Sequence, residues 1–230
     1  MPADIQTIAD PQFILLAWAA GLAIGAGLVS VARVVGPGYT WLTGGSAAFI
    51  ALAGTLAEGA WWARIGALFI AIGLVIARNR SLAGALITIG GFGYLVQAAG
   101  FGGWLPAVTA AAALGGVTGE MMLGHWYLID PRLPRWTLRS LAVVGIVGLA
   151  ADALLVAGLG GLPGGGATVA FWVLLGTSIV LMAAVLGALR YPAYSGVMAA
   201  TGLSYLAVLT TLGAVFLGRA LVAGLGPFST

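Results

Sequence analysis

Two ionisable residues lie in one apolar stretch near the middle of the chain. Glu120 and the single histidine, His125, stand five positions apart, and Tyr127 follows them. A carboxyl group in an apolar segment is costly to insert as an anion, which makes it a candidate for holding or passing a proton. An imidazole and a phenol near a membrane surface are suited to bind the head group of a quinone. The alternative is structural: a carboxyl bound to a neighbouring hydroxyl, and a histidine in the interfacial aromatic belt.

A second carboxyl group, Asp152, lies in the next apolar stretch. It follows Arg139 by thirteen residues, about 20 Å along a helix, whereas Glu120 precedes Asp130 by ten residues, about 15 Å. In antiparallel neighbouring helices the two carboxyls could approach within one helical turn in depth, and two acids in a low dielectric should not both ionise. We therefore interpret four residues as candidates for ligand binding or proton handling: Glu120, His125, Tyr127 and Asp152.

The residue inventory excludes several kinds of chemistry. There is no cysteine, so thiol nucleophiles, disulfides and thiolate metal sites are ruled out. One histidine cannot supply a bis-histidine haem or a multi-histidine metal centre. We predict no catalytic residues and no metal site, and a chain that is not catalytic on its own. A quinone and bound lipids are the only cofactors considered.

A basic turn follows the His125 stretch. Arg132, Arg135 and Arg139 surround two prolines, Pro131 and Pro134, which stiffen the turn. Arginines at this position are expected to bind the anionic head groups of membrane lipids or to dock a partner subunit. The net charge of +3 comes from arginines scattered at helix ends, so nucleic acid is not an expected partner.

The composition places these residues in a lipid bilayer. Hydrophobic residues make up 61% of the 230 residues and charged residues 7%, whereas a soluble domain normally carries about a quarter charged residues. We therefore expect an all-α polytopic membrane protein with about eight transmembrane helices. The predicted segments are approximately 12–33, 40–60, 62–78, 81–99, 105–129, 138–160, 167–189 and 193–218.

The arginines give this array an orientation. If the N-terminus is outside, seven of the nine basic residues fall at the cytoplasmic ends of the predicted helices, in agreement with the positive-inside bias. Arg64 and Arg219 fall on the outer side, and both termini are expected outside. The use of arginine without lysine, with abundant alanine and glycine, is typical of a GC-rich prokaryote. The expected location is the cytoplasmic (inner) membrane.

A weak self-similarity relates the two halves of the chain. Gly91–Leu95 resembles Gly202–Leu206, at an offset of about 110 residues. Four-helix units duplicated in this way would be parallel, with the pseudo-twofold axis along the membrane normal. The alternative is a chance match between glycine-rich apolar sequences. We expect one transmembrane domain, 1–230, with halves 1–100 and 101–230 if the duplication is real.

Three functions are compatible with this inventory. The first is an integral membrane subunit of a larger energy-converting or redox complex, either structural or handling quinone and protons, with other membrane subunits as partners. The second is a small proton-coupled transporter or channel working between two four-helix halves. The third is a structural membrane protein without a ligand.

Overall fold

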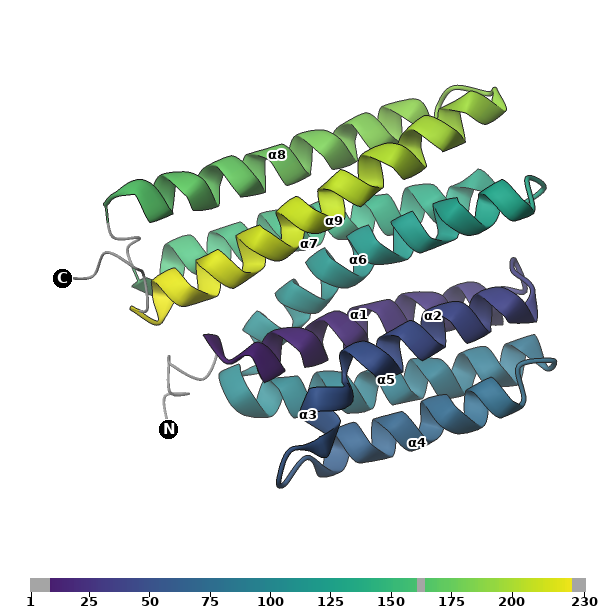
Figure 1. The fold of residues 1–230 in the computed structure, drawn as a ribbon, viewed down its shortest axis with the longest axis horizontal. Helices are drawn as coiled ribbons and strands as arrows, with labels where there is room; N and C mark the ends of the chain where they lie inside the picture. Colours follow the sequence, from purple (N-terminus) through teal and green to yellow (C-terminus); the bar gives the residue numbers. More distant parts are fainter. Residues whose placement is uncertain (1–8, 161–163, 225–230) are drawn as a thin grey trace.

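The computed structural model describes residues 9–160 and 164–224, and in these ranges the chain forms nine α-helices and no strand. They are α1 (Pro11–Val31), α2 (Pro37–Ile50), α3 (Leu52–Leu56), α4 (Trp61–Val75), α5 (Arg80–Gly102), α6 (Trp104–Ile129), α7 (Arg135–Gly160), α8 (Gly166–Ala188) and α9 (Tyr194–Val222). The long helices run side by side with alternating directions (Figure 1). The predicted all-α class is confirmed for the part of the chain described.

Six of these helices are long and apolar enough to cross a membrane: α1, α5, α6, α7, α8 and α9. Helix α4 is apolar but shorter, with 15 residues. The model therefore has the composition and helix lengths of a multi-pass membrane protein. The predicted segments agree closely with the helices except for 40–60, which is divided between α2 and α3.

The break between α2 and α3 falls at Ala51, and arginine caps the second piece. Arg64 donates from Nη2 to the carbonyl oxygen of Ala57 at 3.0 Å and from Nε to that of Thr55 at 3.3 Å. Carbonyl groups at a helix end have no partner within the helix, and in lipid they need one. The guanidinium supplies it, so the helix can end early at this side of the bundle.

Capping side chains and prolines mark the N-terminal ends of several helices. Asp10 accepts a hydrogen bond from the backbone N–H of Gln12 at 2.8 Å, and Pro11 occupies the first position of α1. Proline also begins α2 at Pro37, where its missing N–H costs nothing. Asn79 accepts from the N–H of Leu82 at the start of α5.

Helices α1 and α6 are central and meet through glycine. α1 packs against α2 and α5, α6 packs against α7 and α9, and the hairpin partners α4 and α8 cover α5 and α9. Gly21 of α1 lies directly against the backbone of Ala111 and Gly115 in α6, where a Cβ would have no room. Such close backbone contact is how helices associate in lipid without a hydrophobic driving force.

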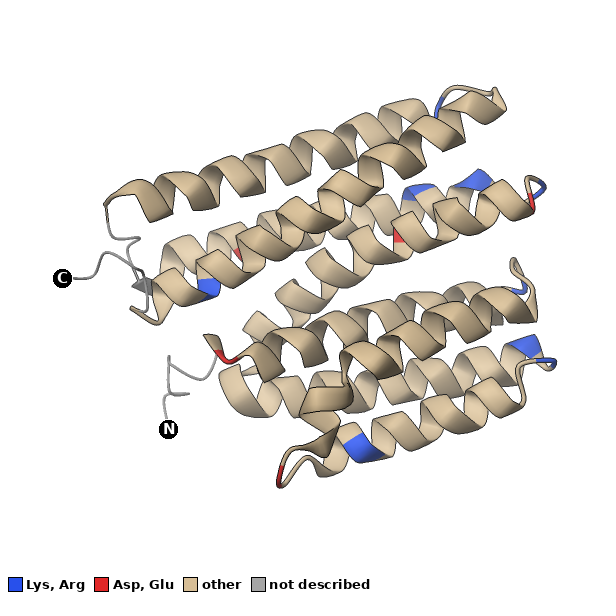
Figure 2. Ribbon diagram, in the orientation of Figure 1, with Lys and Arg blue, Asp and Glu red and all other residues tan. Residues whose placement is uncertain are grey.

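The arginines are distributed as the orientation argument requires, with one exception. Seven of them lie at one end of the bundle, which we call the basic end, and Arg64 lies at the other (Figure 2). Arg219 was expected just beyond the last predicted segment, 193–218, and that boundary is wrong. Helix α9 continues to Val222, and Arg219 is 0% exposed.

Candidate functional site

Glu120 is fully buried between α6 and α9. Its side chain is 0% exposed, and its Oε2 contacts the hydroxyl of Ser204, which is also buried. The other oxygen, Oε1, has no hydrogen-bond partner among the described residues. Gly124, one turn from Glu120, packs against Thr201, one turn from Ser204, so the two helices approach closely here. A glutamate side chain is thereby held in the interior of the bundle with half of its carboxyl group unpaired.

The hydrogens around Ser204 favour a neutral carboxyl group. The Ser204 hydroxyl lies 2.7 Å from the carbonyl oxygen of Ala200 as well as against Oε2 of Glu120. A hydroxyl carries one hydrogen, so both bonds exist together only if Glu120 supplies the second one. No described arginine or histidine bonds to Glu120 to compensate an anion. An uncompensated buried carboxylate is strongly unfavourable, and the protonated form avoids that cost.

His125 lies on the outer side of the same helix pair. Its Nδ1 lies 3.3 Å from the hydroxyl of Tyr205, and both side chains are exposed on the surface of the bundle. Glu120 and His125 thus contact consecutive residues of α9, Ser204 and Tyr205, from two faces of α6. This separation agrees with the helical periodicity, which places Glu120 and His125 about 140° apart.

The aromatic residues beside His125 do not gather around it. Tyr127 is buried, at 6% exposure, on another face of α6. Trp126 packs edge-to-face against Tyr39 of α2, with ring centroids 6.2 Å apart. A quinone ring on the bundle surface would therefore meet His125 and Tyr205, whereas Tyr127 and Trp126 are committed to the protein interior.

Asp152 forms a separate buried site at the end opposite the basic end. It accepts a hydrogen bond from Thr109 of α6 at 2.7 Å and forms an ion pair with Arg219 of α9. Arg219 also donates to the carbonyl oxygen of Pro106 at 3.3 Å, and its guanidinium lies over the ring of Phe13, 5.9 Å from the centroid. The permanently charged guanidinium holds Asp152 as its carboxylate partner.

The expected approach of the two carboxyls is not found. Thr109, which binds Asp152, precedes Glu120 by eleven residues on α6, about 16 Å along the helix axis. Sequence reasoning missed Arg219 because it placed the end of the last segment at residue 218. A usable signal was present: Ala220, Leu221 and Val222 continue the apolar run and extend the helix beyond the arginine.

A line of buried polar residues on α9 joins the two sites. We call this line the α6–α9 seam, and its members are Thr201, Ser204, Thr211 and Arg219, each at most 3% exposed. At 100° per residue they fall within about 80° of one another, and they span about 27 Å along the helix. Three polar atoms of the seam lack partners among the described residues: Oγ1 of Thr211, and Nε and Nη1 of Arg219. Oε1 of Glu120, which faces the seam from α6, lacks one as well.

The predicted docking arginines are largely used inside the protein. Arg139 donates to the carbonyl oxygen of Leu189 at 2.8 Å, and Arg135 donates to those of Tyr191, Pro192 and Ala193. Arg139 therefore caps the C-terminal end of α8, and Arg135 holds the turn that follows it. Arg132 is exposed and pairs with Asp130 at 3.4 Å.

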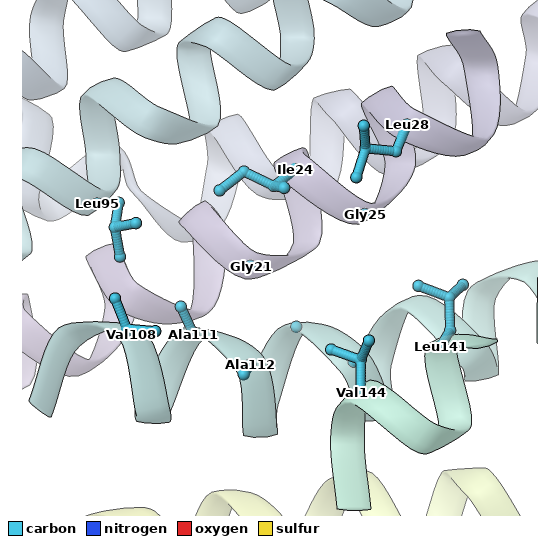
Figure 3. A pocket seen from close by; sticks show the side chains of 12 residues that line it. Gly21, Ile24, Gly25, Leu28, Leu95, Val108, Ala111, Ala112, Leu141 and Val144 are labelled. Atoms are coloured by element: carbon cyan, nitrogen blue, oxygen red, sulfur yellow. The ribbon is translucent and has the colours of Figure 1, made fainter. Parts of the chain in front are cut away.

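An apolar hollow between α1 and α6 adds no chemistry to these sites. It has a volume of about 290 Å³, and its lining includes Ile24, Leu95 and Val144 (Figure 3). No side chain that lines it can donate or accept a hydrogen bond. The hollow therefore suits hydrocarbon and offers nothing that would recognise a polar group.

Comparison of the chain with protein-family models, with curated proteins and with solved structures finds no match. The described residues also contain no group of three or more histidine, cysteine or acidic side chains that could hold a metal ion.

Proposed function

We propose that this protein is a proton-handling integral membrane subunit of a larger energy-converting complex, with Glu120 as the group that holds and releases the proton. The observation that carries the proposal is the carboxyl of Glu120, buried against Ser204 with Oε1 unpaired. Ionisable residues inside membrane bundles mark proton relays and ion pathways when they face the bundle interior.

The rest of the α6–α9 seam supports a route for the proton. Its length of about 27 Å compares with about 30 Å for the hydrocarbon core. Thr211 lies between Ser204 and Arg219 with its hydroxyl unpaired, and buried polar atoms of this kind are commonly bridged by water. On this proposal Glu120 exchanges protons along the seam, and the Asp152–Arg219 ion pair lies at its far end.

The proposed setting is a prokaryotic cytoplasmic membrane crossed eight times. The α2–α3 pair and α4 would supply two spans beyond the six long helices. The basic end would face the cell interior, which puts both termini outside. Other membrane subunits and lipids are the proposed partners. If the complex uses quinone, the exposed His125–Tyr205 pair is placed to hydrogen-bond its head group.

The test uses the complex as it is isolated in mild detergent from the native membrane. We expect the chain to copurify with other subunits and Glu120→Gln to abolish proton-coupled turnover while the complex still assembles. Glu58→Gln is the matched control, because Glu58 undergoes the same chemical change at an exposed position in the other half. Normal proton-coupled turnover in Glu120→Gln would overturn the proposal.

A proton-coupled transporter is the second candidate, and the arrangement of the helices favours it. In each half a central helix, α1 or α6, packs against the last helix of that half, which in turn packs against a hairpin partner. A parallel four-plus-four repeat would produce this arrangement. Proton flux by the isolated chain in liposomes, lost in Glu120→Gln, would support the transporter over the subunit.

A further inference from the structure

Three arginines at the basic end surround a hollow without an acidic side chain. It has a volume of about 360 Å³ and is lined by Arg33, Arg78, Asn79, Arg80 and Ser81. We call it the Arg33 hollow. Arg78 and Arg80 are exposed, and neither forms an ion pair or a side-chain hydrogen bond within the described residues. This contrasts with Arg135 and Arg139 at the same end, whose guanidiniums bind backbone carbonyls.

The chain holds Arg33 in place at a conformational cost. Its φ is +58°, and it is the only described residue other than glycine with a positive φ. This backbone conformation is uncommon for a long side chain. The side chain reaches the first turn of α5, where Nε donates to Ser81 Oγ at 2.8 Å. The bond joins the end of α1 to the start of α5 and leaves the terminal nitrogens of the guanidinium available.

A second, larger groove adjoins the Arg33 hollow. Its volume is about 760 Å³, and it shares Arg78 and Asn79 with the hollow. The remaining lining includes Pro37, Trp41 and Val75, with Trp41 54% and Val75 79% exposed. One end of the combined site is thus cationic, and the other is aromatic and aliphatic. A free phosphate ion would use only the first part.

We propose that the Arg33 hollow and this groove together bind one anionic phospholipid. The phosphate lies among Arg33, Arg78 and Arg80, where arginine can donate paired hydrogen bonds to it. The N-terminal end of α5, which begins at Arg80, adds a favourable dipole for the negative charge. The glycerol and the start of an acyl chain lie along Trp41 and Val75, at the depth of the membrane interface.

The test measures lipid retained by the purified full-length chain, by native mass spectrometry with phosphatidylglycerol as the probe. Arg78→Gln removes a cation shared by both parts of the site, and we expect about fivefold weaker binding from the loss of one arginine. Arg190→Gln is the matched control, because Arg190 is an exposed arginine at the same end but outside the site. Trp41→Ala should also weaken lipid binding, without changing the net charge.

Each outcome decides for or against the site. Selective loss in Arg78→Gln, with Arg190→Gln unchanged and phosphatidylcholine bound poorly, supports it. Equal loss in both arginine variants would show diffuse attraction to a basic surface and overturn the site. Unchanged lipid binding in Trp41→Ala, together with displacement of the lipid by millimolar inorganic phosphate, would identify a simple phosphate site and overturn the lipid assignment. Thermal unfolding of each variant confirms that it is folded.

Discussion

The two four-helix regions of this protein, α1–α5 and α6–α9, bury different kinds of side chain. The charged residues that are buried in the described ranges are Glu120, Asp152 and Arg219, and all three belong to α6–α9. The buried serine and threonine hydroxyls of α1–α5 are paired locally, as where Ser30 pairs with Thr40 at 3.0 Å. The phenol hydroxyls of Tyr39 and Tyr94 are buried there without a partner among the residues described, but they are neutral. Buried charge is therefore concentrated in the second region.

The outer hairpins of the two regions use glycine differently. In α4, Gly66 packs on the backbone of α5, and a Cβ there would lie 2.6 Å from the carbonyl oxygen of Gly90. In α8, Gly176 follows Trp172 as Gly66 follows Trp62, but it has nothing within 4 Å. Close backbone packing through glycine occurs in both regions, so this difference separates α4 from α8 and not one whole region from the other.

The largest effect should come from breaking the buried ion pair. Asp152→Leu leaves the Arg219 guanidinium buried without its counter-ion, which should lower the free energy of unfolding by about 3–5 kcal/mol. The double variant Asp152→Leu with Arg219→Met replaces the pair by apolar groups and should recover most of that loss. Unfolding in mixed detergent micelles measures the free energy of unfolding of the single and the double variant. A single variant as stable as the wild type would contradict a buried pair in this region.

The glycine comparison predicts effects of opposite sign. Gly66→Ala forces α4 and α5 apart and should cost about 1–3 kcal/mol of stability. Gly176→Ala meets no neighbour and should be neutral or stabilising by up to about 1 kcal/mol, because alanine favours the helix. The same unfolding assay compares the two variants. Equal destabilisation would mean that the second hairpin is packed as tightly as the first.

Two of the buried serines, Ser30 and Ser204, give the smallest difference. Ser204→Ala leaves the Glu120 carboxyl without a partner and should cost about 1–3 kcal/mol. Ser30→Ala in the first region leaves only the Thr40 hydroxyl unpaired, for which about 0.5–1.5 kcal/mol is expected. Thermal unfolding of the two variants shows which one is less stable. A larger loss of stability in Ser30→Ala than in Ser204→Ala would contradict a special role for the hydroxyl beside Glu120.

Much of this architecture could be predicted from the chain, because a bilayer requires helices about 20 residues long. The predicted segments, the basic end and the burial of Glu120 follow from that requirement. The end of α3 at Leu56 could not be predicted, since it depends on Arg64 reaching back to the carbonyls of Thr55 and Ala57.

The pairing of side chains was harder to predict than the helices. Periodicity gives the direction of Glu120 on α6 but not the rotation of α9, so its partner Ser204 was one of several available hydroxyls. The predicted depths of Glu120 and Asp152 were counted from different loops. The resulting error in depth made the predicted separation of the two carboxyls too small. The structure instead assigns Asp152 to Arg219, whose position within α9 was missed.

Infrared difference spectroscopy of the protein in lipid vesicles at neutral pH tests the protonated state of Glu120 most directly. We predict a C=O stretching band of a protonated carboxyl group that shifts in D₂O, disappears in Glu120→Gln and persists in Asp152→Asn. Spectra in which Glu120→Gln removes only carboxylate bands would show an ionised Glu120 and contradict the account.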